Sequence, residues 1–327
     1  MGHQIMKNIV VIGGGTGSFT LLSGLKSYPL QLTALVSMAD DGGSTGVLRD
    51  EYGVLPPGDI RQCLVALSTT PSLRDLFDYR FSDGTFAGHS FGNVFLSTAE
   101  KMTGSFERAV DLASEVLAVS GRVLPITTTD TKLVHVDADG TKTVGEYKIA
   151  HSRLNEQPLL SLDPVATITP RAKKAIAEAD IVVIAPGNLY GSLAPALLVR
   201  GVQQALESTQ AKIVYVCNLV TKPKQTDHFK VHDYVDEIER FIGASCIDVV
   251  IYNTDEPPPS LLKKYTRDGE FIVDFDLDIM HTKHYKAVGV PLIDAQPVTA
   301  HVGDAIARSR TLIRHNSRVV AELLLSL

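Results

Sequence analysis

The chain has 327 residues, of which 44% are hydrophobic and 21% charged, and its net charge is -6. These values predict a globular protein with ample apolar material for a core. The acidic balance argues against a surface for nucleic acids or anionic membranes, and the absence of Trp, with 6% aromatic residues, argues against base stacking.

The N-terminal region predicts a βαβ unit. Residues 7–15, KNIVVIGGG, form a short apolar strand that ends in glycines, and residues 18–28 place apolar side chains at helical spacing. Residues 32–41, LTALVSMADD, form a second strand that ends in acids. A strand, a glycine turn, a helix and a strand imply parallel strands joined by a right-handed crossover.

Three helices are expected next, over residues 58–68, 92–102 and 106–119. The character of the sequence then changes. Apolar and polar residues alternate around a DG turn in KLVHVDADGTKTVGEYKI, which is the pattern of an antiparallel hairpin. We interpret residues 122–150 as a β-hairpin excursion on the edge of the main fold.

The second half of the chain resumes the parallel pattern. Apolar strands are expected over residues 181–188, 211–218, 246–253 and 290–295, and helices over residues 171–180, 193–208, 231–242, 257–265 and 318–327. Nearly continuous apolar strands are typical of a sheet that is covered on both faces. The predicted fold class is therefore α/β. It is one three-layer, Rossmann-like domain over residues 1–327, with a mostly parallel sheet, helices on both faces and a small β-hairpin insertion.

Three scattered cysteines, Cys63, Cys217 and Cys246, form no CxxC pair. This spacing fits neither a disulfide framework nor a zinc site, so we expect a reducing environment. No apolar run approaches the ~20 residues of a membrane span. The first apolar run is also shorter than the ~7–15 residues of a signal-peptide core. We therefore expect a cytoplasmic protein without a membrane span.

Polar, glycine-rich clusters follow nearly every predicted strand. They are GGGTGS, ADDGGSTG, APGNLYGS, CNLVTKP and YNTDEPPP, at residues 13–18, 39–46, 185–192, 217–223 and 252–259. In open α/β sheets, ligands bind beyond the carboxyl ends of the strands. The coincidence therefore predicts a ligand site at this edge of the sheet.

The turn at residues 13–18 resembles the dinucleotide fingerprint GxGxxG, with Ser18 at the last glycine position. Its backbone N–H groups at a helix N-terminus can hold a phosphate. Asp40 at the next strand end favours this interpretation over a plain tight turn, and the absence of a following GK[ST] argues against a Walker-type site. The residues predicted to hold the phosphate are Gly13, Gly14, Gly15, Thr16, Gly17 and Ser18.

Asp40 and Asp41 have two functional interpretations. One carboxylate could accept a hydrogen bond from a ribose hydroxyl, or the pair could hold Mg²⁺ beside a diphosphate. The structural alternative is that Asp40 caps a loop or helix. Asp59 could likewise cap the helix that carries Arg61.

The exit loop at residues 185–192 supplies a second set of backbone donors at a helix start, where a cap and an anion site use the same N–H groups. His89 lies between glycines in a loop that could face a ligand, and a structural loop histidine is the alternative. Beyond the first turn, the residues that we predict to bind the ligand from the sequence pattern are Asp40, Asp41, Gly42, Asp59, Arg61, His89, Asn93, Gly187, Asn188, Leu189, Ser192, Asn218 and Thr221.

Together these motifs resemble one family. VVIGGGTGS, ADDGGSTGVLR, GVLPPGDIRQCLVAL, GHSFGN, APGNLYGSLAPALL and YVCNLVTKPKQTD are similar to the YvcK-type gluconeogenesis factors of the CofD-like superfamily, which also holds the 2-phospho-L-lactate transferases. The resemblance runs in order from about residue 7 to the C-terminus. It implies a Rossmann-like nucleotide-binding fold.

The two branches of this superfamily imply different functions. The transferases use a guanosine diphosphate-linked substrate and a divalent metal to move a phospholactyl group to a deazaflavin. The YvcK branch binds UDP-sugars, notably UDP-N-acetylglucosamine, and is linked to gluconeogenic growth, cell shape and peptidoglycan synthesis. This chain lacks the histidine-containing loop that follows the paired aspartates in the transferases, which argues against deazaflavin transfer.

The resemblance also points to particular residues in the C-terminal part of the chain. A tyrosine after the NT-x-PP stretch is associated with UDP-sugar binding in the YvcK branch, and Tyr265 is the matching position here. A threonine near the C-terminus is phosphorylated in some members, and Thr299 and Thr311 lie in that region.

The leading hypothesis is therefore a regulatory protein that binds a nucleotide sugar, without an assigned catalytic residue. The first alternative is a Mg-dependent transferase with a nucleotide-diphosphate-linked donor, in which Asp40 and Asp41 hold the metal. The second is an NAD-type dinucleotide-binding protein, against which Ser18 counts. The expected partner is a small nucleotide ligand, and a second copy of the chain and cell-wall synthesis proteins are further candidates.

Overall fold

The structure is a computed structural model that describes residues 6–294 and 312–327. Its main sheet has seven strands in the order β10-β9-β8-β7-β1-β2-β3, and every neighbouring pair is parallel. The strands are β1 (Asn8–Gly13), β2 (Gln31–Val36), β3 (Arg122–Pro125), β7 (Ile181–Ile184), β8 (Lys212–Val216), β9 (Val249–Asn253) and β10 (Lys286–Val290). The predicted α/β class and parallel sheet are confirmed.

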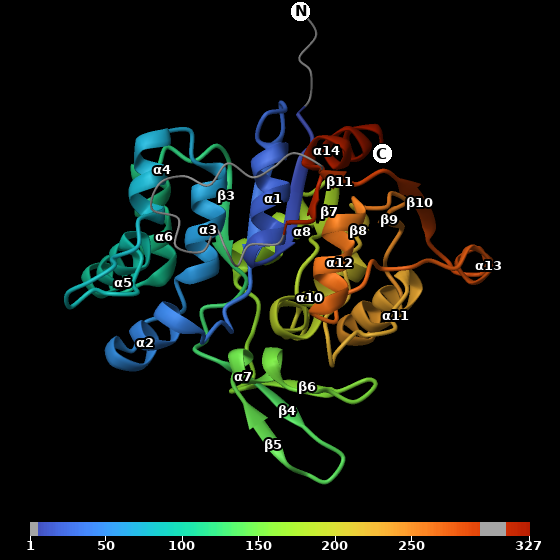
Figure 1. Cartoon of the computed structure of the whole chain (residues 1–327). Helices are drawn as coiled ribbons and strands as arrows, with labels where there is room; N and C mark the ends of the chain where they lie inside the picture. Colours follow the sequence, from blue (N-terminus) through green and yellow to red (C-terminus); the bar gives the residue numbers. More distant parts are fainter. Residues whose placement is uncertain (1–5, 295–311) are drawn as a thin grey trace, which may run out of the picture.

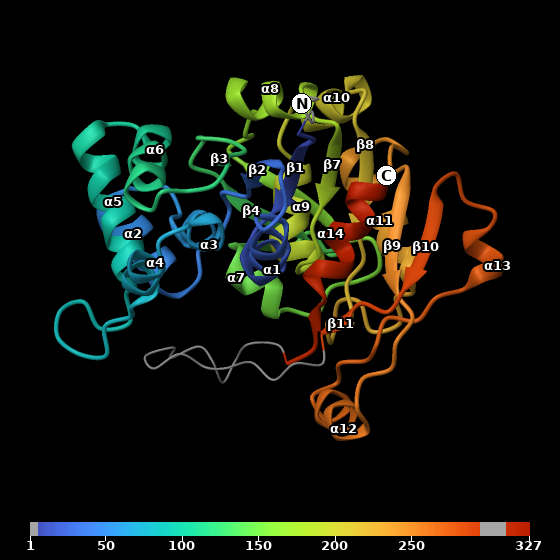
Figure 2. The same cartoon turned by 90° about the horizontal axis from the view of Figure 1, so that it is seen from above.

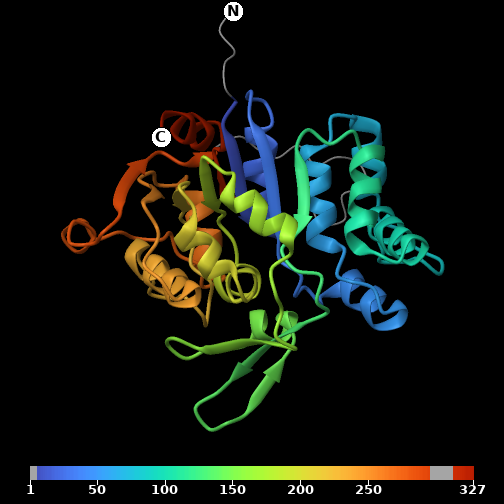
Figure 3. The same cartoon turned by 180° about the vertical axis from the view of Figure 1, so that it is seen from behind.

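Helices cover both faces of this sheet. Figures 1 and 2 place α1 (Gly15–Leu25), α3 (Gly58–Leu67) and α14 (Ser317–Ser326) on one face. The opposite face, seen in Figure 3, carries α8 (Pro170–Ala177), α10 (Val202–Ser208) and α11 (Val231–Ile242). The result is the predicted three-layer arrangement.

The alternation of side chains along β1 explains why both faces need helices. Ile9 and Val11 pack in the core on the α1 side, whereas Val10 and Ile12 pack in the core on the α8 side. All four side chains are at most 2% exposed. Since successive strand residues point to opposite faces, an uninterrupted apolar strand is stable only between two helical layers.

Beside β3 lies a group of helices, α2 (Gly43–Tyr52), α4 (Pro71–Asp78), α5 (Phe91–Thr103) and α6 (Phe106–Val116) (Figure 1). The sequence predicted α5 and α6 but not α2 or α4. Three of the first four positions from Gly43 to Gly46 are glycine or serine, which are poor helix formers. In α4 only Phe77 is buried, so the apolar signal is weak.

The interpretation of residues 122–150 as one excursion is wrong at both ends. Residues 122–125 form β3, which pairs with β2 inside the main sheet, because the short run RVLP buries three of its four residues. The predicted hairpin is present as β4 (Lys132–Val136) and β5 (Lys142–Val144), followed by α7 (Glu146–His151). A third strand, β6 (Leu159–Asp163), pairs with β4.

We call residues 127–168 the insertion. Its two ends meet, since the Thr169 backbone N–H donates to the Ile126 carbonyl at 2.9 Å. Figure 1 shows the three-stranded sheet of the insertion beyond the carboxyl ends of the main strands. The insertion therefore leaves and re-enters the main fold at one point, on the edge where ligands are expected.

Two other predicted elements differ in the structure. The helix expected over 193–208 is divided into a π-helical turn η1 (Leu189–Leu193), α9 (Ala194–Leu197) and α10, since Gly201 adopts φ +97° and breaks the helix. The strand expected over 290–295 is replaced by β10 and the short β11 (Ile293–Asp294), which pairs with β12 (Arg314–His315). The remaining helices are α12 (Pro259–Arg267) and α13 (Leu277–Met280).

The order of the strands fixes where a ligand can bind. The chain runs from β1 outward through β2 and β3, and then returns to the other side of β1 with β7. The crevice at such a reversal is the usual ligand site of an open α/β sheet. Within the described residues, no helix is long and apolar enough to cross a membrane.

Candidate functional site

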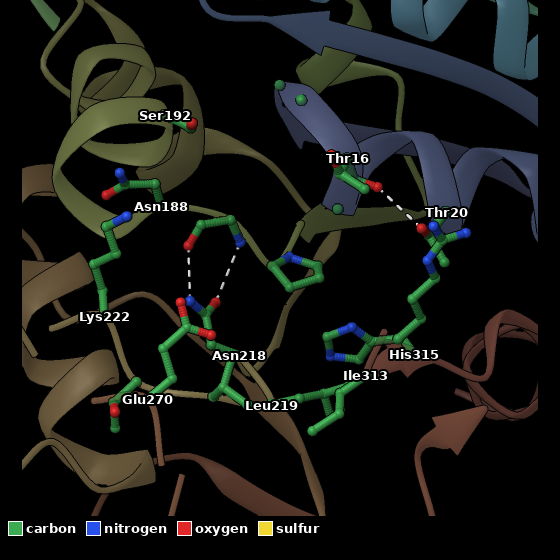
Figure 4. A pocket seen from close by; sticks show the side chains of 18 residues that line it. Thr16, Thr20, Asn188, Ser192, Asn218, Leu219, Lys222, Glu270, Ile313 and His315 are labelled. Atoms are coloured by element: carbon green, nitrogen blue, oxygen red, sulfur yellow. Dashed lines mark hydrogen bonds between the residues drawn. The ribbon is translucent and has the colours of Figure 1, made fainter. Parts of the chain in front are cut away.

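A cavity of about 400 Å³ opens at the reversal point, beyond the carboxyl ends of β1, β7 and β8 (Figure 4). Five separate segments of the chain build its walls, one of which is the loop after α12 that carries Glu270. The other four are the first turns of α1, the loops after β7 and β8, and the C-terminal segment around β12. Its lining is Gly14, Gly15, Thr16, Gly17, Thr20, Pro186, Gly187, Asn188, Ser192, Asn218, Leu219, Val220, Thr221, Lys222, Glu270, Ile313, Arg314 and His315.

The N-terminus of α1 faces this cavity. The N-cap Gly14 offers no side-chain cap, and the first turn holds no acidic residue. The Gly15 N–H is hydrogen-bonded to the carboxyl group of Asp59. The other N–H groups of the first turn and the helix dipole favour an anion. Gly15 has φ +64°, a left-handed conformation that favours glycine.

Gly17 and Ser18 have packing roles in this turn. A Cβ on Gly17 would lie 1.8 Å from the Pro186 carbonyl oxygen, so only glycine lets α1 approach the loop after β7. Ser18 is buried, and its hydroxyl makes no hydrogen bond with any residue that the structure describes. Gly13 and Ser18 lie next to the cavity and are not part of its lining.

Two asparagines hold the loops after β7 and β8 in place. Asn218 donates to the Gly187 carbonyl at 2.7 Å and accepts from the Gly187 N–H at 3.2 Å, which fastens the two loops together. Asn188 caps η1 by accepting from the Gly191 N–H at 3.2 Å. Both asparagines and Ser192 line the cavity, whereas Leu189 is buried in the core.

Lys222 places a cationic side chain in the cavity. Figure 4 shows Lys222, Asn188 and Ser192 along one wall, with Thr16, Thr20 and His315 along the other. The side chain of the neighbouring Thr221 is held in place, since its hydroxyl accepts a hydrogen bond from the Phe271 N–H at 3.1 Å. An ammonium group here is suited to a phosphate ligand.

Glu270 also lines the cavity, on the same side as Lys222. Burial raises the pKa of the Glu270 carboxyl, and the charge of Lys222 opposes that effect. The cavity therefore brings together a cation, a carboxyl group and amide donors.

Tyr265 reaches the cavity only indirectly. Its buried hydroxyl accepts hydrogen bonds from the backbone N–H groups of Leu312 and Ile313, at 2.7 and 3.0 Å. Ile313 and His315 of the same segment line the cavity, but Tyr265 does not. The structure thus places Tyr265 behind the lining, where it positions the C-terminal segment. The threonines considered as phosphorylation sites, Thr299 and Thr311, lie outside the described residues.

Four acidic side chains lie on the other side of the α1 turn. A Cβ on Gly14 would be 2.1 Å from Asp59 Oδ2, and one on Gly58 would be 2.9 Å from Asp40 Oδ2. Asp41 accepts from the Tyr147 backbone N–H at 2.8 Å, which joins the insertion to this loop. Glu146, next to Tyr147, completes the group that we call the acidic group: Asp40, Asp41, Asp59 and Glu146.

Burial and mutual repulsion change how the acidic group ionises. Burial raises the pKa of Asp59 to about 7, and the charge of Asp40 adds to this effect. Burial raises the pKa of Glu146 to about 8, with further contributions from Asp40, Asp59 and Asp41. Carboxyl groups with such values can hold or release protons near neutral pH.

The geometry of the acidic group is not that of a formed metal site. Asp40 Oδ1 accepts a hydrogen bond from the Gly42 N–H at 2.9 Å, and Asp41 Oδ1 accepts one from the Tyr147 N–H. Among residues 6–294 and 312–327, no cluster of three or more His, Cys, Asp or Glu side chains is arranged to hold a metal ion. Metal binding by Asp40 and Asp41 therefore stays a prediction.

Three predicted ligand residues form a separate polar chain away from the cavity lining. Arg61 donates to Asn93 Oδ1 at 3.0 Å and pairs with Asp78. Asn93 donates to Ser44 Oγ at 3.2 Å, and this hydroxyl lies 2.9 Å from His89 Nδ1. The chain connects α3, α5 and α2, so these side chains hold the helices beside β3 together.

Sequence reasoning missed several residues of the site. Lys222 lay within the CNLVTKP cluster, and a basic residue among strand-exit polar residues was an available signal. Glu146 and His315 gave no such signal, since each lies far along the chain from the glycine motifs and reaches the site only through the tertiary fold. The missed residues of the cavity lining are Thr20, Pro186, Leu219, Val220, Lys222, Glu270, Ile313, Arg314 and His315.

Comparisons with known proteins cover nearly the whole chain. Residues 9–294 match the family model described as 2-phospho-L-lactate transferase CofD. The chain is 38% identical to the gluconeogenesis factor of Bacillus subtilis, over 98% of this chain and 97% of that protein. It is 37% identical to the gluconeogenesis factor of Halalkalibacterium halodurans, over 98% and 96%.

A solved structure gives the same result for the fold. The crystal structure of a member of the UPF0052 family from Bacillus halodurans has a TM-score of 0.89 and 34% identity, and the match covers 98% of this chain and 99% of that one. The likeness therefore extends well beyond the glycine-rich turn at residues 13–18, to the sheet and to the loops that line the cavity.

Proposed function

The chain belongs to the CofD family, as its motifs predicted, and from this we propose that it is a regulatory protein that binds a nucleotide-diphosphate sugar of the UDP-N-acetylglucosamine class. Its relatives named gluconeogenesis factors support a role in carbon metabolism. We further propose that occupancy of the cavity links the supply of this sugar nucleotide to cell shape and peptidoglycan synthesis.

The observation that carries the proposal is that the N-terminus of α1 and the side chain of Lys222 line the same cavity. The backbone N–H groups of Thr16 and Gly17 and the ammonium group of Lys222 together suit the charges of a diphosphate. A volume of about 400 Å³ lies within the usual range of small-ligand sites. Asn188 and Ser192 supply further polar groups for a sugar.

Isothermal titration calorimetry with UDP-N-acetylglucosamine, UDP and NAD tests the proposal. We expect one site per chain, with the sugar nucleotide bound more tightly than NAD. Binding of NAD without UDP-N-acetylglucosamine would favour the dinucleotide alternative. Absence of binding by any of these ligands at millimolar concentration would rule the proposal out.

The variant Lys222→Met tests the role of the ammonium group. Loss of a charge-assisted hydrogen bond to phosphate costs about 1.5–3 kcal/mol, so affinity should fall roughly tenfold or more. Lys264→Met makes the same chemical change on the exposed side of α12, away from the cavity lining, and should bind like the wild type. Equal affinities of Lys222→Met and the wild type would contradict the assignment.

A transferase with a nucleotide-diphosphate-linked donor is the second candidate function. The observation that favours it is the acidic group, whose carboxyl groups lie beside the proposed phosphate site with pKa values raised to about 7 for Asp59 and about 8 for Glu146. Carboxylates in this position suit a divalent cation that neutralises phosphate charge.

Magnesium-dependent turnover of the bound donor distinguishes this candidate from a pure binding protein. If the chain is a transferase, Asp40→Asn or Asp41→Asn should abolish turnover while calorimetry still detects the ligand. Asp137→Asn, in the exposed turn of the insertion, is the matched control and should keep turnover. A wild type that binds the sugar nucleotide and shows no turnover with Mg²⁺ would leave the regulatory function standing alone.

A further inference from the structure

His315 is a buried histidine that projects from β12 toward the centre of the cavity (Figure 4). It is 8% exposed. Its position is fixed from two sides, because β12 pairs with β11 and the next residue, Asn316, donates its N–H to the Leu292 carbonyl at 2.6 Å. These contacts hold the backbone of His315, and the hydrogen bond of its Nε2 to the Cys217 carbonyl holds the ring.

One nitrogen of the His315 ring has a determined protonation state. Nε2 lies 2.8 Å from the carbonyl oxygen of Cys217, at the end of β8. A carbonyl oxygen only accepts, so Nε2 must carry the hydrogen. In a neutral imidazole the other nitrogen, Nδ1, is then a bare acceptor.

The imidazole is neutral in this setting. Burial lowers the pKa of His315 to about 4, and the hydrogen bond to Cys217 opposes this effect only in part. The charged side chains that share the cavity lining are Lys222, Glu270 and Arg314. Nδ1 makes no hydrogen bond with any residue in the described parts of the chain.

We infer that Nδ1 of His315 accepts a hydrogen bond from a hydroxyl or N–H group of the ligand and so selects for a ligand with a donor at this point. The phosphate groups are excluded as its partners, because a phosphate oxygen and a bare imidazole nitrogen both lack the hydrogen. The donor belongs either to the nucleoside or to the sugar of the ligand. The identity of the ligand rests on the proposed function, whereas the tautomer of His315 does not.

Two substitutions at His315 distinguish the contribution of Nε2 from that of Nδ1. In His315→Gln the side-chain amide can occupy the place of Nε2 and keep the bond to Cys217, but nothing replaces Nδ1. In His315→Asn an amide oxygen can occupy the place of Nδ1, but the bond to Cys217 is lost. The pair therefore tests the acceptor apart from the contact that holds the ring.

Calorimetry with UDP-N-acetylglucosamine should give roughly tenfold weaker binding for His315→Gln, since the ligand donor is left without a partner. His315→Asn should restore most of that affinity, to within about threefold of the wild type. His281→Gln, at an exposed position after α13, is the matched control. Equal binding by His315→Gln and the wild type, or an equal loss in both His315 variants, would overturn the inference.

Titration with UDP locates the donor. If the donor lies on the nucleoside, His315→Gln should weaken the binding of UDP and of UDP-N-acetylglucosamine by the same factor. If it lies on the sugar, only binding of the sugar nucleotide should weaken. If His315→Gln weakened the binding of UDP but not of the sugar nucleotide, both positions of the donor would be contradicted.

Nitrogen-15 NMR of histidine-labelled protein separates a failure of this inference from a failure of the proposed function. The signal of His315 is identified among the ten histidines by its loss in His315→Gln. Between pH 5.5 and 8 the free protein should show a protonated Nε2 and a bare Nδ1. A protonated Nδ1 would overturn the inference, whether or not the wild type binds UDP-N-acetylglucosamine.

Discussion

Burial of His315 has a consequence for stability that is independent of any ligand. The pKa of His315 is lowered from 6.5 to about 4 in the folded protein. Between these values the unfolded chain binds more protons than the folded one, so folding loses stability as pH falls. The contribution is fully present above pH 6.5 and is lost on going down toward pH 4.

Comparison of the wild type with His315→Gln by urea denaturation measures this contribution. The glutamine variant keeps the bond to Cys217 and has no titrating ring. We expect the free energy of unfolding of the wild type, relative to this variant, to fall by up to about 1.4 kcal/mol per pH unit below pH 6.5. Lys222, Glu270 and Arg314 are present in both proteins, so their titration cancels. A constant difference from pH 7 to pH 4.5 would contradict a neutral, buried imidazole.

Individual residues of the site were predictable to the extent that their role was local. Gly14, Gly15 and Asn188 stand in glycine-rich strand exits, and each lines the cavity. Arg61 and His89 stand in similar motifs but are taken up by hydrogen bonds within the helices beside β3. A motif reports which residues occupy a turn, and only the tertiary fold decides which of them faces a ligand.

The contact between α1 and the loop after β7 fixes the shape of the cavity. In an isolated helix, replacing Gly17 with alanine would stabilise the helix by about 1 kcal/mol. Here the added Cβ would lie 1.8 Å from the Pro186 carbonyl oxygen, a backbone atom that cannot rotate away. We expect Gly17→Ala to lower the free energy of unfolding by about 1–3 kcal/mol, because overpacking outweighs the helix propensity.

Ser23→Ala on the same helix is the matched control for Gly17→Ala. The Ser23 hydroxyl is buried and has no hydrogen-bond partner among the described residues, so its removal should leave stability unchanged or slightly raised. Chemical denaturation of both variants gives the comparison. A Gly17→Ala protein that is as stable as Ser23→Ala would show that α1 and β7 can move apart without cost.

The elements themselves were predictable where they are apolar and regular. β1, β2, β7, β8 and β9 were each expected within a few residues, since their continuous apolar runs require burial on both faces. β10 was missed because it is an edge strand with no fully buried residue. The break before α10 was missed because Gly201 ends a segment whose apolar spacing is otherwise helical.

At the scale of the whole molecule, the main sheet either folds without the insertion or needs it in order to fold. None of residues 127–168 lines the cavity, and the two residues that flank the insertion, Ile126 and Thr169, are hydrogen-bonded to each other. Against this, Leu133, Ile149 and Leu162 of the insertion are buried in the same core as β1. The first observation predicts that the main sheet folds alone, and the second predicts that it does so with reduced stability.

Excision of the insertion tests whether the main sheet folds without it and how much stability is lost. Ile126 is joined to Thr169 through Gly-Ser-Gly, which spans their hydrogen-bonded ends. We expect a cooperatively folded protein with a lower melting temperature, because the core loses the burial supplied by Leu133, Ile149 and Leu162. Circular dichroism and hydrogen exchange of β1 measure the fold, and calorimetry measures ligand binding. Binding of UDP-N-acetylglucosamine should persist within about tenfold, since all cavity-lining segments remain.

The control places the same Gly-Ser-Gly segment in the exposed turn between β4 and β5, after Ala138, where stability should not change. A non-cooperative, molten product of the excision would mean that the insertion is an integral part of the domain. A second outcome is a folded product that no longer binds a ligand that the wild type binds. The acidic group, which loses Glu146 and the Asp41–Tyr147 bond in this variant, would then contribute to holding the nucleotide as well as flanking its site.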